Sequence, residues 1–78
     1  MRKSLHTVKN GIFLAWLKCK RAEQGLTMRE LALRLDMPHS FIGKVEQGER
    51  RLDIIELISY CEALEVDPID CIRMLTKA

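Results

Sequence analysis

The sequence predicts a small all-α domain of five short helices, and three observations lead to this fold class. Apolar residues recur at spacings of three and four along most of the 78-residue chain, as they do on one face of a helix. No segment alternates apolar and polar residues over the length of a strand, and no Asn-Gly or Asp-Gly pair joins two apolar runs. Capping residues, glycines and prolines then divide the chain into five segments.

The first two helices have clear ends. The first is expected over residues 10–24, and Gly25 follows it as a left-handed C-terminal residue. Thr27 caps the second helix, and Glu30, three residues later, completes a capping box. The residues expected to face inward are Phe13, Leu14, Leu17 and Arg21 in the first helix and Leu31, Ala32 and Leu35 in the second.

The remaining three helices are also bounded by caps and breakers. Pro38 is suited to the first turn of a third helix, over residues 38–47, and Gly48 ends it. Asp53 caps the fourth helix, and Asp67 followed by Pro68 starts the fifth. Inward-facing residues are expected to be Ile42 and Val45 in the third helix and Ile54, Leu57, Ile58, Cys61 and Leu64 in the fourth; the fifth carries Ile69, Ile72 and Leu75.

Only two or three residues, around Asp36 and Met37, separate the second helix from the third. So short a link produces a sharp crossing, the helix-turn-helix unit, in place of an antiparallel hairpin. The second helix of such a unit projects its outer face away from the core. Here that face carries His39, Ser40, Gly43, Lys44 and Gln47.

The net charge of +2 conceals an uneven distribution of charge along the chain. Residues 1–21 carry six cations and no acid, residues 22–51 balance, and residues 52–78 carry six acids against two cations. This asymmetry indicates a polyanionic partner on one side, although charged side chains also simply solvate helix surfaces. Residues 1–9 are interpreted as a basic arm or a disordered terminus, and residues 10–78 as one domain.

Several classes of function and location are excluded by what the sequence lacks. The longest apolar run, residues 12–17, is too short for a membrane span, and it resembles no signal peptide because it stops at Lys18 without a cleavage site. A cytoplasmic protein is therefore expected. Cys19, Cys61 and Cys71 lack the paired spacing of zinc ligands, so neither a metal nor another cofactor is expected. No catalytic motif is present, and the chain is not expected to be an enzyme.

In an ordered set of segments the sequence resembles the Cro/repressor-type helix-turn-helix family, the XRE-like regulators. The similarity extends over roughly residues 12 to 75. The resemblance implies a compact five-helix lambda-repressor-like domain that binds double-stranded DNA. The matching segments are residues 21–27 (RAEQGLT), 30–32 (ELA), 38–50 (PHSFIGKVEQGER) and 63–68 (ALEVDP).

The resemblance also implies which residues read DNA bases in the major groove. Lys44 is suited to donate to guanine O6 and N7, whereas His39 and Ser40 each donate or accept and fix no base. Gly43 has no side chain and leaves room for close approach, including that of a thymine methyl group. The family often has Gln in place of His39 and Ser in place of Gly43, so a different operator preference is expected. Phe41 either packs between the first and third helices or contacts a sugar or methyl group.

Two further groups of residues follow from the resemblance. Arg21 and Glu46 occupy positions that pair in the family, and they are expected to form a partly buried ion pair. Phosphates are expected at the N-terminus of the second helix, where Met28 replaces a common Gln, and at the loop after the third helix. The phosphate-binding residues are Thr27, Met28, Arg29, Gln47, Arg50 and Arg51.

Two functions from different classes remain open. The first is a homodimeric transcriptional regulator, a repressor, on a two-fold operator, with a dimer surface at the end of the fourth helix and on the fifth, where Ile69, Met74 and Leu75 are partly exposed. The second is a protein-interaction module, such as an antitoxin or an adaptor, that keeps the same fold for an unidentified protein partner. The cations around the third helix favour DNA.

Overall fold

A computed structural model describes residues 7–78 as five α-helices without a strand, which confirms the predicted fold class. Expectations that concern residues 1–6, including the phosphate-binding arm that begins with Arg2 and Lys3, lie outside the described residues. The helices are α1 (Val8–Glu23), α2 (Met28–Leu35), α3 (His39–Glu46), α4 (Ile54–Leu64) and α5 (Pro68–Lys77).

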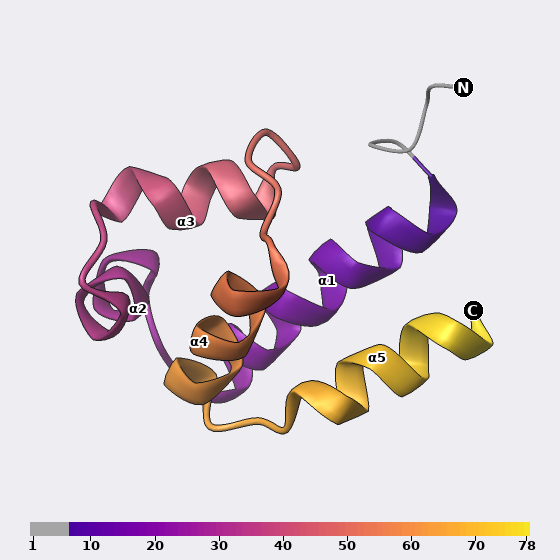
Figure 1. Ribbon diagram of the computed structural model, residues 1–78. Coiled ribbons are helices and arrows are strands. Elements are labelled where there is room, and N and C mark those ends of the chain that lie inside the picture. Colours follow the sequence, from indigo (N-terminus) through magenta and orange to yellow (C-terminus); the bar gives the residue numbers. More distant parts are fainter. Residues whose placement is uncertain (1–6) are drawn as a thin grey trace.

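The helices are arranged so that the α2–α3 unit occupies one end of the molecule (Figure 1). α2 packs against α3 and α4, and α1 packs against α3 and α5. Toward the other end α1 and α5 lie side by side, and both ends of the described chain are found there (Figure 1). The long first helix therefore connects the helix-turn-helix unit to the C-terminal helix.

The caps form where the sequence places them, with small shifts of the boundaries. The Thr27 hydroxyl accepts from the amide of Glu30 at 3.0 Å, and the Glu30 carboxylate accepts from the amide of Thr27 at 2.8 Å. Asp53 and Glu56 form a second capping box at α4. α1 begins at Val8, two residues earlier than expected, because Thr7 caps it; Lys9 thus lies in the first turn of α1. Pro38 is the N-cap of α3, one residue before the helix.

The core is formed by residues from all five helices, and most of the expected inward residues are buried. Cys61 and Cys71 are both buried as free thiols, which fits the behaviour of cysteine as a small hydrophobe. Gly48 has φ of +80° after α3, and a Cβ at this position would lie 3.2 Å from Cδ1 of Leu14. The fully buried residues include Leu17, Leu31, Ala32, Ile42, Val45, Tyr60, Cys61, Leu64 and Cys71.

The expected inward face of α4 is partly wrong. Ile54 and Ile58 are 60% and 39% exposed, whereas Tyr60, which was not expected in the core, is 1% exposed. The residues that face inward are Leu57, Tyr60, Cys61 and Leu64, a stripe rotated from the expected one. α4 has a polar stripe of Glu56, Ser59 and Glu62, but its apolar residues extend over a wide face, so their spacing did not identify which of them are buried. Two isoleucines of α5, Ile69 and Ile72, are exposed as well.

Candidate nucleic-acid interface

The link between α2 and α3 consists of three residues, and one of them has a left-handed backbone. Asp36 has φ of +55° and caps α2, with its amide directed at the carbonyls of the last turn. The amide of Met37 donates to the carbonyl of Ala32 at 3.0 Å. These bonds end α2 abruptly, and Pro38 starts α3 in a new direction. The chain therefore builds the sharp turn on which the helix-turn-helix unit depends.

The four expected base-reading residues lie together on the outer face of α3. Phe41, Ile42 and Val45 are buried on the opposite face and fix the rotation of the helix about its axis. Phe41 therefore belongs to the core, where it lines a hollow with Leu35 of α2 and Tyr60 of α4. The expected position between α1 and α3 stays a prediction. His39, Ser40 and Lys44 are exposed, and Gly43 is partly exposed between them. Three polar side chains and a gap at the glycine thus face solvent together.

The N-terminus of α2 presents backbone donors close to this face. The amides of Thr27 and Glu30 are already used by the capping box. The amides of Met28 and Arg29, at the first two helical positions, have no acceptor within the helix. Exposed Arg29 adds a cation at the same place. An anion at this end of α2 would thus be bound by two amides, the helix dipole and one guanidinium.

The loop after α3 holds Arg50 in a fixed position. Its guanidinium donates to both carboxylate oxygens of Glu56, at 2.5 and 3.1 Å, and to the carbonyl of Arg51. It also lies over the ring of Phe41, 5.3 Å from the centroid. The hydrogen bond that Arg50 donates to Glu56 raises the pKa of Arg50 and lowers the pKa of Glu56. Glu56 was not expected at this site from the sequence, although its place three residues after the cap Asp53 signals a structural carboxylate.

Gln47 and Arg51 lie close to Arg50 in the sequence and are the other two expected phosphate-binding residues after α3. Gln47 is the exposed C-cap of α3, and Arg51 is exposed in the loop. Together with Arg50 they belong to the end of α3 and the segment that follows it, whereas Thr27, Met28 and Arg29 lie at the start of α2. The expected phosphate-binding residues are thus divided between these two segments.

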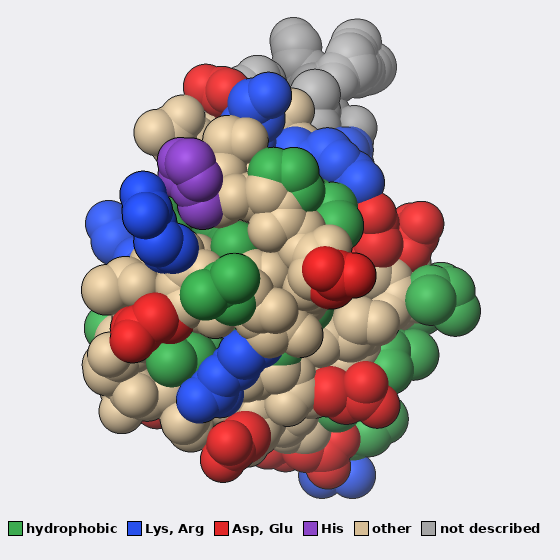
Figure 2. Space-filling model, turned by 90° about the vertical axis from the view of Figure 1, so that its left-hand side faces the viewer, with side chains coloured by type: hydrophobic (Ala, Val, Ile, Leu, Met, Phe, Trp, Pro, Cys, Tyr) green, Lys and Arg blue, Asp and Glu red, His purple; other side chains and the backbone are tan. Residues whose placement is uncertain are grey.

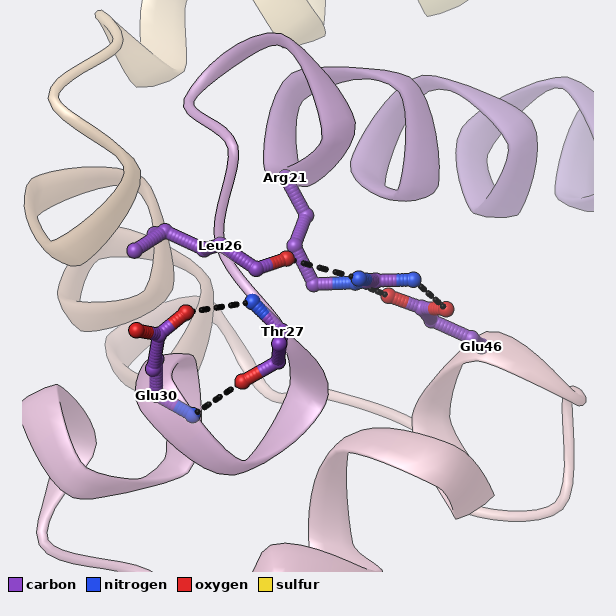
Figure 3. A network of polar contacts seen from close by, with 5 residues as sticks. All are labelled: Arg21, Leu26, Thr27, Glu30 and Glu46. Carbon is purple, nitrogen blue, oxygen red and sulfur yellow. Dashed lines mark hydrogen bonds and ion pairs between the residues drawn. The ribbon is translucent and has the colours of Figure 1, made fainter.

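An ion pair between Arg21 and Glu46 joins the end of α1 to the end of α3 (Figure 3). Nε of Arg21 lies 2.6 Å from one carboxylate oxygen of Glu46, and Nη2 lies 3.1 Å from the other. Nη1 donates to the carbonyl of Leu26 at 2.8 Å, a third bond that the sequence did not indicate. The side chains are only 14% and 4% exposed, and the hydrogen bond that Arg21 donates to Glu46 raises the pKa of Arg21. The pair therefore fixes α3 and the segment before α2 to α1.

The surface at the α2–α3 end carries a mixture of side chains. Figure 2 views the molecule from the side on which α2 lies, and it shows cationic and hydrophobic side chains close to one another there. Exposed hydrophobic residues of this unit are Met28, Leu33 and Met37. Within residues 7–78, no group of three or more His, Cys, Asp or Glu side chains could hold a metal ion. No helix in the same range is long and apolar enough to cross a membrane.

The chain is similar to known helix-turn-helix proteins in sequence and in structure. Residues 17–70 match the sequence family described as helix-turn-helix. Among proteins with curated functions, no sequence matches this chain. A solved XRE-family like protein from Pseudomonas syringae pv. tomato is 36% identical, with a TM-score of 0.87, over 95% of this chain and 90% of that protein.

Two further solved structures are similar over nearly the whole chain. The restriction-modification controller protein C.Esp1396I, a tetramer in complex with its natural 35-base-pair operator, is 26% identical, with a TM-score of 0.79, over 92% of this chain and 95% of that one. The clp gene regulator ClgR from Corynebacterium glutamicum is 25% identical, with a TM-score of 0.78, over 91% of this chain and 76% of its own.

Proposed function

The chain belongs to the XRE-type helix-turn-helix family, and from this premise we propose that it is a DNA-binding transcription regulator that acts as a homodimeric repressor on a two-fold operator. The observation that carries the proposal is the outer face of α3, where His39, Ser40 and Lys44 are exposed together. The similarity of the chain to a controller protein bound to its operator and to a gene regulator supports the same activity. The place of action is the compartment that holds the DNA, in keeping with the expected cytoplasmic location.

Recognition is proposed to divide between the two helices of the unit. α3 enters the major groove, where Lys44 donates to guanine and His39 and Ser40 contact neighbouring base edges. The free amides at the start of α2 and the guanidinium of Arg29 bind one phosphate. Gln47, Arg50 and Arg51 contact the backbone at the other edge of α3. The phosphate contacts set the register of α3, and the base contacts supply the sequence preference.

A second copy of the chain is proposed because one α3 contacts too few base pairs to select an operator. Two copies related by a two-fold axis would read half-sites about 34–36 Å apart, one turn of DNA. The proposed dimer surface combines two exposed isoleucines of α4 with those of α5, a helix in which Met74 and Leu75 are partly buried. These isoleucines are Ile54, Ile58, Ile69 and Ile72. Repression then requires only that the dimer occupies its site.

Salt dependence of binding separates this function from that of a protein-interaction module. Each copy brings Arg29, Lys44, Arg50 and Arg51 to the proposed DNA surface. If a dimer neutralises six or more phosphates, its DNA affinity falls by about 10³-fold or more between 50 and 200 mM salt. Fluorescence anisotropy with operators selected from a random pool measures this dependence. A flat response to salt, or no binding, would contradict DNA recognition and favour a protein partner.

Lys44→Ala and Arg29→Ala are expected to affect DNA binding in different ways. Lys44→Ala should weaken binding to the selected operator by about 10- to 100-fold per half-site, the usual range for one bidentate base contact, and relax the preference at one position of each half-site. Arg29→Ala should weaken selected and random DNA alike and reduce the number of counterions released on binding by about one per copy, or about two per dimer. Titration of both DNAs with both variants measures the difference.

Lys18→Ala serves as the matched control, since Lys18 is an exposed cation on α1 that has no proposed contact with DNA or with the second copy. It should leave both affinities unchanged. Arg50→Ala is a less direct test of a phosphate contact because it also releases Glu56 from its ion pair. Equal losses on both DNAs for Lys44→Ala would show that Lys44 contacts the backbone and not a base.

A further inference from the structure

The side chain of Met28 reaches from the first turn of α2 to the outer face of α3. Its Sδ lies 3.9 Å from the position that a Cβ would occupy on Gly43. Met28 nevertheless remains 37% exposed, so it covers the glycine only from one side. Gly43 lies one helical turn after His39 and immediately before Lys44. The thioether is thus part of the same surface as the proposed base-reading residues.

The missing side chain of Gly43 leaves an open space on this surface, with the thioether of Met28 at one side. We refer to this space as the recess. Apart from the Met28 sulfur, and outside the glycine's own helix and chain neighbours, no heavy atom lies within 4 Å of that Cβ position. The backbone of α3 at Gly43 forms the floor of the recess, and the thioether forms one wall. The exposed side chains of His39 and Lys44 precede and follow it on α3. The space is therefore open toward a ligand that approaches α3 from outside.

The chemistry of the recess differs from that of a phosphate contact. A methionine side chain has no N–H or O–H to donate, so only the backbone amide of Met28 suits a phosphate. Its polarizable thioether packs instead against apolar groups. In the major groove the apolar group that a base pair presents is the 5-methyl group of thymine, which cytosine carries only when it is methylated.

We propose that Met28 is a specificity-determining residue, and that it forms with Gly43 a recess for the 5-methyl group of a pyrimidine, normally thymine, in each operator half-site. The inference rests on the proposed DNA-binding function and adds a residue of α2 to the readout by α3. The absent side chain at position 43 provides the space, and the side chain at position 28 provides the contact. Lys44 beside them places a hydrogen-bond donor next to this methyl group.

The proposal is tested by removing one methyl group from the DNA at a time. Operators selected by the wild-type protein are synthesised with uracil in place of each thymine in turn, and dissociation constants are measured by fluorescence anisotropy. Uracil at the contacted position should weaken binding by about fourfold per half-site, or about fifteenfold when both half-sites carry it, as expected for the loss of one buried methyl group. 5-Methylcytosine, paired with guanine at that position, should bind more tightly than cytosine by the same factor.

Met28→Ala should bind thymine and uracil operators with equal affinity. Met28→Gln, which introduces hydrogen-bonding groups at the same place, should also lose the discrimination while it keeps or increases the affinity for random DNA. Met37→Ala is the matched control: Met37 has the same 37% exposure and precedes α3, and this variant should discriminate like the wild type. Thermal unfolding of each variant verifies that it is folded.

The possible outcomes separate this inference from the function on which it rests. If the wild type binds DNA in a salt-dependent manner but no thymine is sensitive to uracil, the recess has no role in readout. If Met28→Ala still distinguishes thymine from uracil at the sensitive position, another residue contacts the methyl group. Both results overturn the inference and leave the DNA-binding function intact. Absence of salt-dependent DNA binding by the wild type would overturn both.

Discussion

Replacing Glu46 with alanine is expected to lower the free energy of unfolding by about 3–5 kcal/mol, the range observed when one partner of a buried ion pair is removed. The carboxylate is 4% exposed and accepts two hydrogen bonds from Arg21. Among residues 7–78, the guanidinium would then keep the carbonyl of Leu26 as its one remaining acceptor. Urea unfolding followed by circular dichroism measures the loss.

The Lys20–Glu23 pair provides a control within the same helix. Its atoms are 3.4 Å apart, and its side chains are 29% and 58% exposed. Glu23→Ala is therefore expected to change the free energy of unfolding by less than about 1 kcal/mol, as is usual for surface pairs. A double-mutant cycle with Arg21→Ala and Glu46→Ala isolates the coupling between the two side chains. If the two losses add without coupling, the pair does not join α1 to α3 energetically.

A protein with Ile58→Lys and Ile69→Lys is expected to be monomeric and to bind its operator about 10²- to 10⁴-fold more weakly than the wild type, because the two half-sites would no longer be bound as one unit. Ile58 and Ile69 are 39% and 50% exposed in the single chain, so the substitutions should leave the helices folded. They place charges within the proposed dimer surface, where burial without a partner is unfavourable. Light scattering measures the mass, and anisotropy measures the affinity.

The choice of lysine makes this test sharper, since added positive charge by itself strengthens binding to DNA. A loss of operator affinity could therefore not be caused by the added charge, which acts in the opposite direction. Binding to an isolated half-site should be unchanged or slightly stronger. Leu33→Lys is the control: Leu33 is exposed on α2, outside the proposed dimer surface, and the variant should remain dimeric. A dimeric double variant would place the interface elsewhere.

The helices themselves followed from the sequence because their ends are set by local chemistry. Thr27 with Glu30 forms the expected capping box, and Gly25 and Gly48 adopt the left-handed backbone at the ends of helices. Such signals depend only on residues within a few positions of one another. The boundary at Pro38 differed by one residue because both the cap and the first helical position accept its fixed φ.

The orientation of α4 did not follow from the sequence. Ile54 and Ile58 fit an apolar stripe as well as Leu57 and Tyr60 do, and only packing against the other helices selects the buried side. A helix with apolar residues on two faces is what a chain with a partner surface would contain. The exposed isoleucines of α4 thus extend the dimer surface that was already expected at the end of this helix and on α5.

The sequence predicted which residues of the candidate site face outward, but not which side chains of other helices they contact. The rotation of α3 follows from Ile42 and Val45, and it brings His39 and Lys44 to the outer face as expected. The partners of Arg50 and the neighbour of Gly43 depend on how separate helices approach one another, which spacing along the chain does not determine. The hydrogen bond from Arg21 to the carbonyl of Leu26 could not be predicted for the same reason.

The ion pair of Arg50 with Glu56 has a consequence for the kinetics of DNA binding. Because a carboxylate neutralises this guanidinium at close range, Arg50 adds little to the long-range attraction that accelerates encounter with a polyanion. Exposed cations without such a partner, such as Arg29 and Lys44, would set the association rate. Arg50 is already oriented by Glu56 and the ring of Phe41, so little side-chain freedom would be lost when it meets a phosphate. Its contribution would therefore be to the lifetime of the complex, through slower dissociation.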